Sequence, residues 1–196
     1  SSEDDVEIVW KAPWVKHDSH ILVATEYFRL FRYGYQGSMT SGGALQFSFL
    51  KAAFDRKINF MGQMGLKKLL DQWDLYHTLF HSFEMRCPSL QIIQEDQHTM
   101  VRAPAIMHLR ISRATISTLY PHILQNERIV QKLIGQVLRV PVLIHFRYDE
   151  NGIIDTFNTE ADVTSGFLKL LGCAEDAEFV SNGCHFRDDA ELEILP

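Results

Sequence analysis

The sequence predicts an α+β fold in which helices cover one face of a mainly antiparallel sheet. Apolar residues recur at helical spacing up to Phe80 and alternate with a period of two after it, and an Asn-Gly pair joins two of the alternating runs. Helices that come first, followed by long strands, are typical of α+β proteins. A chain of 196 residues is long enough for one such domain.

The first eighty residues contain the expected helices, which lie over about 18–33, 44–54 and 63–80, with a short strand over 55–62 before the last. Asp18 or Ser19 can cap the first helix, and GYQGSMTSGG at 34–43 is a loop by composition. The third helix carries a broad apolar face made of Leu66, Leu69, Leu70, Trp73, Tyr76 and Phe80.

After Phe80, strands are expected over about 83–95 and 98–114, a helix near 126–134, and a short amphipathic helix, TSGFLKLLG, over 164–172. The alternation in the second strand directs His108 and Arg110 to one face. It directs to the opposite face an apolar set made of Val101, Ala103, Ala105, Met107, Leu109 and Ile111.

The stretch VLIHFRYDENGIIDTFNTEADV, residues 142–163, predicts a hairpin. Asn151-Gly152 favours a type I′ turn with a two-residue loop, because that turn needs positive φ at both central residues. This register pairs Val142 with Ala161, Ile144 with Thr159, Phe146 with Phe157 and Tyr148 with Asp155. One face is then apolar, and the other is polar except for Leu143 and Ile154.

The composition excludes some classes of function. The net charge of −6 argues against a chain that neutralises nucleic-acid phosphates, and no apolar run approaches the length of a membrane span. Three cysteines form no disulfide framework, which suits a reducing compartment. We divide the chain into a leader at 1–17, a domain at 18–180 and an acidic tail at 181–196.

The order of elements is similar, over roughly 18–172, to the nuclear transport factor 2-like (SnoaL-like) superfamily. That resemblance implies a cone-shaped fold, in which about three N-terminal helices pack in the concavity of a curved, mainly antiparallel sheet. A narrower resemblance is carried by EYFRLFRYGY, LLDQWDLYHTLF, TLYPHIL, KLIGQVL followed by FRYDENGII, and LLGCAEDAEFV. These strings look like the domain C-terminal to the basic leucine zipper in oomycete transcription factors.

The narrower resemblance implies a nuclear regulator whose DNA contacts are made elsewhere in the parent protein. This chain has no basic region and no leucine heptads, so DNA binding is assigned to none of its residues. We therefore expect a non-catalytic accessory domain that serves dimerisation, partner recruitment or ligand sensing. The expected partners are a second copy of the chain and an apolar small molecule, with no membrane.

An apolar pocket between helices and sheet is a feature that the cone fold implies. Nine side chains are candidates to line it: Tyr27, Phe31, Phe47, Trp73, Tyr76, Met107, Ile144, Phe146 and Phe157. Such a set fits an apolar ligand site, but it equally describes a core filled to native density, which is the commoner outcome for aromatic residues at helical spacing.

The sequence gives less support for a catalytic site or a metal site. Scytalone dehydratase and ketosteroid isomerase, relatives by the resemblance, use His, Asp and Tyr side chains that project into the cone. Here His108 and His145 fall on polar strand faces, and only Asp155 is expected inside. We predict no catalytic residue and keep as the alternative a small cone-fold dehydratase or isomerase acting on an apolar substrate. His77 and His81 lack a third ligand, so neither a metal nor a cofactor is predicted.

The outer sheet face is a candidate interface, because cone-fold relatives often dimerise through it. It mixes apolar and basic side chains, with candidates His108, Arg110, Leu143, His145, Arg147 and Ile154. A solvated face is the alternative, since one polar face is normal in antiparallel sheets.

Overall fold

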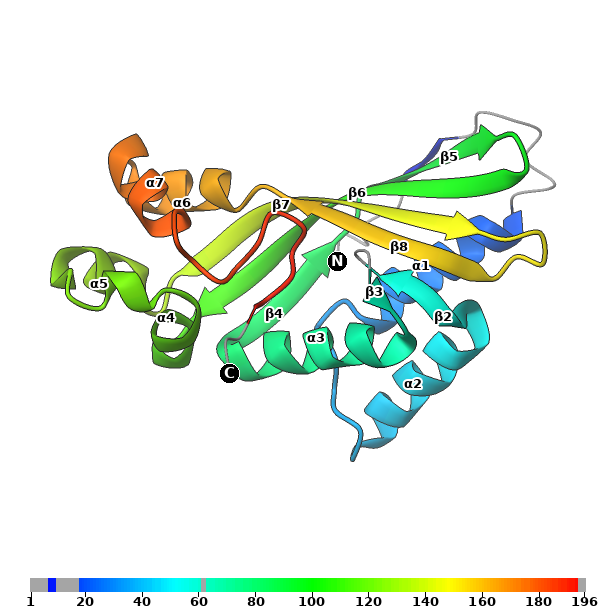
Figure 1. Cartoon of the computed structure of the whole chain (residues 1–196), viewed down its shortest axis with the longest axis horizontal. Helices are drawn as coiled ribbons and strands as arrows, with labels where there is room; N and C mark the ends of the chain where they lie inside the picture. The colour runs from blue at the N-terminus through cyan, green and yellow to red at the C-terminus, as the bar shows by residue number, and fades with distance from the viewer. Residues whose placement is uncertain (1–6, 10–17, 61–62, 194–196) are drawn as a thin grey trace.

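The computed structural model describes residues 7–9, 18–60 and 63–193 of the chain (Figure 1). Three long helices lie against one face of a curved sheet: α1 (Asp18–Leu30), α2 (Ser41–Ala53) and α3 (Leu66–Leu79). A second group of short helices gathers at one end: α4 (Arg113–Leu119), a 3₁₀ turn (Pro121–Ile123), α5 (Glu127–Leu133), α6 (Val163–Leu171) and α7 (Ala174–Ser181). The fold is the expected α+β cone.

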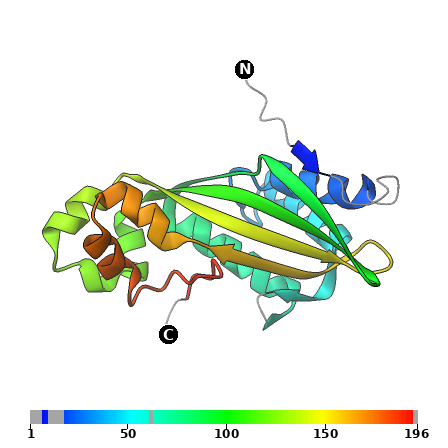
Figure 2. The ribbon, with the colours of Figure 1, turned by 90° about the horizontal axis from the view of Figure 1, so that it is seen from above.

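The strands form a single bent sheet with the order β1-β5-β6-β7-β8-β2-β3, to which β4 adds by pairing with β6. Their bounds are β1 (Glu7–Val9), β2 (Phe54–Phe60), β3 (Gln63–Met64), β4 (Phe80–Arg86), β5 (Ser89–Glu95), β6 (His98–Ile111), β7 (Val137–Tyr148) and β8 (Ile154–Ala161). Seen from above, β6, β7 and β8 lie in front of α2 and α3 (Figure 2). The inner face of the sheet is therefore covered by helices.

The single strand expected over 83–95 is two strands, β4 and β5. Both pair with β6, but β5 pairs with its first half up to Arg102 and β4 with its second half from Ile106. Pro88 lies at the break between them. Pro104 of β6 lies where one partner strand gives way to the other, a position where its missing N–H interrupts the ladder least.

The alternation in β6 and β7 is confirmed. The six inward residues expected in β6 are at most 5% exposed, and Phe146 pairs with Phe157 as the hairpin register requires. The apolar faces of the first and third helices also point to the core, since Tyr27 and Trp73 are 1% and 7% exposed. The helical and strand periodicities of the sequence thus predicted most of the buried core residues correctly.

The turn of the hairpin differs from the expected two-residue loop. Gly152 has φ +78°, whereas Asn151 does not have a positive φ, so the turn is not type I′. The Asp149 carboxylate accepts hydrogen bonds from the backbone N–H groups of Asn151 and Ile153, at 2.8 and 3.0 Å. The loop is consequently longer, and Tyr148 pairs with Ile154 rather than with the expected partner.

The segment after α7 packs against the cone, although its acidic composition indicated a tail. Phe186 and Leu192 form an isolated antiparallel bridge and are 3% and 1% exposed. The helix α7 itself was not expected. Of the leader, the structure describes only β1, which pairs in parallel with Ser89–Gln91; residues 1–6 and 10–17 lie outside the described part of the chain.

Candidate cavity and outer sheet face

A small cavity lies between α3, the inner sheet face and the segment after α7. Its volume is about 50 Å³. Its lining is mostly aromatic and aliphatic: Tyr27, Phe60, Leu69, Gln72, Trp73, Tyr76, Phe83, Met85, Met107, Val142, Ile144, Phe157, Thr159, Asp189 and Ala190. Drug-sized ligands occupy pockets of roughly 300–1,000 Å³, so a cavity of this volume holds a few waters at most.

The aromatic side chains beside the cavity pack as a core. The Tyr27 ring lies 4.9 Å from that of Phe31, 5.4 Å from that of Phe146 and 5.6 Å from that of Phe157, measured between centroids. Rings at such spacings add attraction beyond their burial. This cluster fixes α1 onto the β7–β8 hairpin, and two of its members, Tyr27 and Phe157, line the cavity.

The nine pocket candidates divide into three groups. Those that line the cavity are Tyr27, Trp73, Tyr76, Met107, Ile144 and Phe157. Phe31 and Phe146 are fully buried but do not line it. Phe47 is 39% exposed, so its assignment to the pocket was wrong.

The orientation of α2 explains the error at Phe47. This helix buries Gly43, Gln46, Leu50 and Ala53. Phe47, which follows Gln46, therefore points to solvent. Gln46 is 1% exposed because its side chain accepts a hydrogen bond from the Gln36 N–H and donates to the carbonyls of Leu30 and Gly34. A buried glutamine on an otherwise apolar helix cannot be recognised from hydrophobic spacing alone.

Other lining residues were missed for different reasons. Gln72 follows Leu69 and precedes Tyr76 at helical spacing on α3, so its position on the inner face could have been found. Asp189 and Ala190 belong to the acidic end of the chain and line the cavity through long-range packing, which no local pattern reports.

The polar groups at the cavity are suited to hydrogen bonding. Burial raises the pKa of the Tyr76 phenol well above its usual value, and burial likewise raises that of Tyr27. Both phenols therefore stay protonated at neutral pH, and the Tyr76 hydroxyl donates a hydrogen bond to the Ala190 carbonyl at 2.6 Å. Among the described lining residues no histidine occurs, and the Asp189 carboxylate accepts a hydrogen bond from the Glu191 N–H at 2.9 Å.

The outer sheet face carries five of the six interface candidates: His108, Arg110, Leu143, His145 and Arg147 are half-buried on it. Ile154 is 0% exposed and faces the core, so its assignment to this face was wrong. A bulge between the Arg147 and Tyr148 pairs shifts the register of β8 there and turns Ile154 inward. Asp155, which was expected inside, forms an ion pair with Arg147 at 2.9 Å instead.

Four apolar residues run across the middle of this outer face, which we call the outer apolar stripe: Pro104 and Ile106 of β6 with Leu143 and Pro141 of β7. Pro104 pairs with Leu143, and Ile106 pairs with Pro141. Only Leu143 of the four was predicted. The alternation of β6 already placed Pro104 and Ile106 on this side.

Basic pairs flank the outer apolar stripe at both ends. Arg102 pairs with His145 beyond one end, and His108 pairs with Arg139 beyond the other. Partial burial lowers the pKa of both histidines, and the neighbouring arginines lower it further, against the opposing pull of Glu84 on His108 and of carboxylates on His145. Both imidazoles are therefore neutral at pH 7.

The fold is similar to solved structures of low sequence identity. A putative polyketide cyclase from Xanthomonas campestris pv. campestris superposes with a TM-score of 0.50 at 9% identity, over 79% of this chain and 98% of that chain. An NTF2-like protein of unknown function from Exiguobacterium sp. 255-15 gives a TM-score of 0.48 at 15% identity, over 71% of this chain and 98% of that one. At these identities the likeness concerns the fold alone.

At the level of sequence, no curated protein matches the chain. Residues 22–79, from α1 to α3, match the family described as the BZIP transcription factor 1 C-terminal domain. Among the described residues, no helix is both long and apolar enough to cross a membrane. The chain therefore has the α+β cone fold and, over residues 22–79, resembles the BZIP transcription factor 1 C-terminal domain.

Proposed function

We propose that this chain is a non-catalytic accessory domain of a nuclear basic leucine zipper transcription factor and that it pairs two copies of that factor. The family match over residues 22–79 supports the parent class and, through it, the nuclear location. The outer apolar stripe is the observation that carries the pairing role. DNA is contacted by another part of the parent protein, since this chain has a net charge of −6.

The outer apolar stripe is suited to a two-fold contact. Its four residues lie on adjacent strands, and α1, α2 and α3 cover the opposite face of the sheet. A two-fold axis through the stripe would lay apolar residues against their own copies, as an isologous interface requires. Apolar centres with charged rims are common in stable dimers.

The charges around the outer apolar stripe complement one another. Glu84 of β4 pairs with His108 at one end and is held by Arg32 and Arg86, whereas Glu160 of β8 pairs with Leu143 at the side of the stripe. A second copy can align its carboxylates with the basic pairs at the ends of the stripe. Two domains attached to one leucine zipper also meet at high effective concentration, so even a weak contact between them would form.

The test is the oligomeric state of wild type and of Leu143→Asp. We expect wild type to sediment as a dimer at tens of micromolar and Leu143→Asp as a folded monomer, because the new charge would be buried in the contact. Leu45→Asp is the matched control, since Leu45 is 57% exposed on α2, away from the sheet. A monomeric wild type, or dimer loss with Leu45→Asp as well, would contradict the proposal.

The second candidate is a small cone-fold dehydratase or isomerase acting on an apolar substrate. It is favoured by the shared fold with a putative polyketide cyclase. Against it, general acid–base catalysis needs a proton donor and acceptor within reach of a substrate. The described cavity lining offers Asp189 as its only carboxylate, and this side chain already holds the Glu191 N–H.

A further inference from the structure

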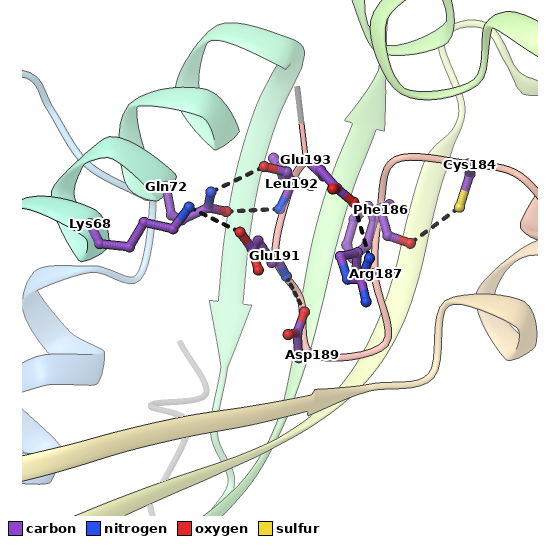
Figure 3. A network of polar contacts seen from close by, with 9 residues as sticks. All are labelled: Lys68, Gln72, Cys184, Phe186, Arg187, Asp189, Glu191, Leu192 and Glu193. Atoms are coloured by element: carbon purple, nitrogen blue, oxygen red, sulfur yellow. Dashed lines mark hydrogen bonds and ion pairs between the residues drawn. The ribbon is translucent and has the colours of Figure 1, made fainter. Parts of the chain in front are cut away.

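The segment Phe186–Leu192, here called the C-terminal strap, crosses the mouth of the cone beside α3 (Figure 3). Its ends are joined by the Phe186–Leu192 bridge, and the Arg187 N–H donates to the Glu191 carbonyl at 2.9 Å. The strap therefore forms a narrow loop whose tip is Asp188–Ala190. At this tip, the Asp188 carbonyl accepts a hydrogen bond from the Ala161 N–H at the end of β8.

One face of α3 binds the strap through three residues spaced four apart. Lys68 Nζ lies 2.9 Å from Glu191 Oε1, and the Tyr76 hydroxyl donates to the Ala190 carbonyl at 2.6 Å. Between them, the Gln72 amide holds the strap backbone (Figure 3). Residues at i, i+4 and i+8 lie along one helix face, so α3 presents a cation, an amide and a phenol in line.

The strap tip forms the wall that keeps the cavity small. Asp189 and Ala190 line it together with the aromatic side chains, and its volume is about 50 Å³. The other lining residues belong to the helices and sheet of the cone. Removing the tip would open the apolar interior to solvent along α3 without moving any strand.

The strap is held less firmly than the elements it covers. Its one bridge is internal, α3 holds it through side chains, and its backbone joins the sheet at Ala161 rather than through a continuous ladder. Ala190 has φ +66°, a left-handed conformation that strains a residue with a Cβ. Four carboxylates lie within six residues, and two of them are held by ion pairs, Glu191 with Lys68 and Glu193 with Arg187. Segments of this kind open with less free energy than a core strand.

We propose that the C-terminal strap is a gate on the cone, and that its release exposes a binding site for a flat, apolar organic acid. The aromatic walls favour a flat apolar body. The groups that the strap now satisfies become free for the ligand: Lys68 for a carboxylate or similar anion, and Gln72 and Tyr76 for its polar oxygen atoms. The cavity is lined by none of the four stripe residues, although Asp188 at the strap tip borders the same surface hollow as Pro104, Pro141 and Leu143. Probe binding and oligomeric state are measured separately, so either proposal can fail alone.

The experiment releases the strap in the full chain and measures binding of 1-anilinonaphthalene-8-sulfonate, a flat apolar anion. Leu192→Asp places a charge at a position that is 1% exposed and should expel the strap. Hydrogen exchange at 186–192 reports whether the strap has left, and near-ultraviolet dichroism reports whether the core is intact. We expect the probe to bind at least about tenfold more tightly than to wild type, because the competent state is then populated before binding.

Two variants in the Leu192→Asp background show where the probe binds. Val142→Phe fills the cavity and should abolish the gain, and Lys68→Ala should weaken binding several-fold by removing the cation. Leu124→Asp is the matched control for the charge, since Leu124 is 47% exposed. It should leave both probe binding and strap exchange as in wild type.

A folded variant whose strap has left but whose affinity for the probe is unchanged overturns the proposal. A gain that survives Val142→Phe overturns it too, because the probe would then bind elsewhere. If Leu192→Asp fails to fold, the milder Glu191→Gln removes the ion pair with Lys68 and leaves every group assigned to the ligand in place; it is judged by the same two outcomes.

Discussion

The side-chain amide of Gln72 makes two hydrogen bonds to the backbone of Leu192, a residue 120 positions later in the chain. Gln72 Nε2 donates to the Leu192 carbonyl at 3.1 Å, and Gln72 Oε1 accepts from the Leu192 N–H at 2.8 Å. Both residues are buried. The Gln72 side chain thus makes the pair of backbone hydrogen bonds that a neighbouring strand would otherwise make with Leu192.

Replacing Gln72 with leucine should destabilise the domain by about 2 kcal/mol or more, because it leaves a buried N–H and a buried carbonyl without partners. Urea unfolding measures the loss. Gln131→Leu is the control, since the exposed Gln131 amide donates only to Glu127; we expect a change within about 0.5 kcal/mol there. Equal losses for the two variants would contradict the assigned role.

Gln46→Glu should destabilise the domain increasingly as the pH rises. The Gln46 amide donates to two carbonyls, and a carboxylate cannot donate to either. Burial should raise the pKa of the introduced glutamate above its unfolded value of about 4.3, so stability is lost as the pH rises through and above that value. Unfolding at pH 5 and pH 8 measures the difference, and Gln46→Leu is expected to lack this pH dependence.

Phe157→Ala should lower the free energy of unfolding by about 3–5 kcal/mol, the usual range for truncation of a buried phenylalanine. Phe157 is 4% exposed, and its ring lies 5.3 Å from that of Phe146. The control is Phe179→Ala, because Phe179 is 45% exposed and should cost about 1 kcal/mol or less. A small loss for Phe157→Ala would mean that the cavity wall rearranges to fill the space.

Acidification should destabilise the domain partly through His108 and His145. Their pKa values are lowered in the folded state, chiefly by burial, so the unfolded chain binds more protons below its own histidine pKa. Stability is therefore present at pH 7.5 and falls as the pH drops through about 6.5, the unfolded value, toward the lower folded values. The double variant His108→Gln, His145→Gln should show a shallower fall in melting temperature between pH 7.5 and 5.5. An unchanged slope would assign the effect to other groups.

Local periodicity was enough to predict much of this fold. The period of two in β6 and β7 determines which side chains face the core, because successive residues of a strand point to opposite sides whatever the strand pairs with. The Phe146–Phe157 pair followed from that period and from the approximate place of the turn. Helical spacing likewise put Tyr27 and Trp73 inside.

The error at Ile154 arises because one residue more or less in a turn or strand reverses the sheet face to which the following side chains point. The longer turn around Gly152 and the bulge beside Tyr148 bring Ile154 into the core. The Asp149 carboxylate stabilises this turn by accepting hydrogen bonds from two backbone N–H groups of the loop. An Asn-Gly pair favours one turn, but it does not exclude a neighbouring side chain from stabilising another.

By itself, the sequence determined the α+β class, the faces of the long strands and most of the aromatic core, because these depend on residues two to four positions apart. Only the tertiary structure decided that the acidic end of the chain closes the cone, that β4 and β5 share β6, and that Phe47 lies outside. The physical reason is that these features depend on contacts such as Gln72 with Leu192, between residues 120 positions apart, whose free energy no local pattern contains.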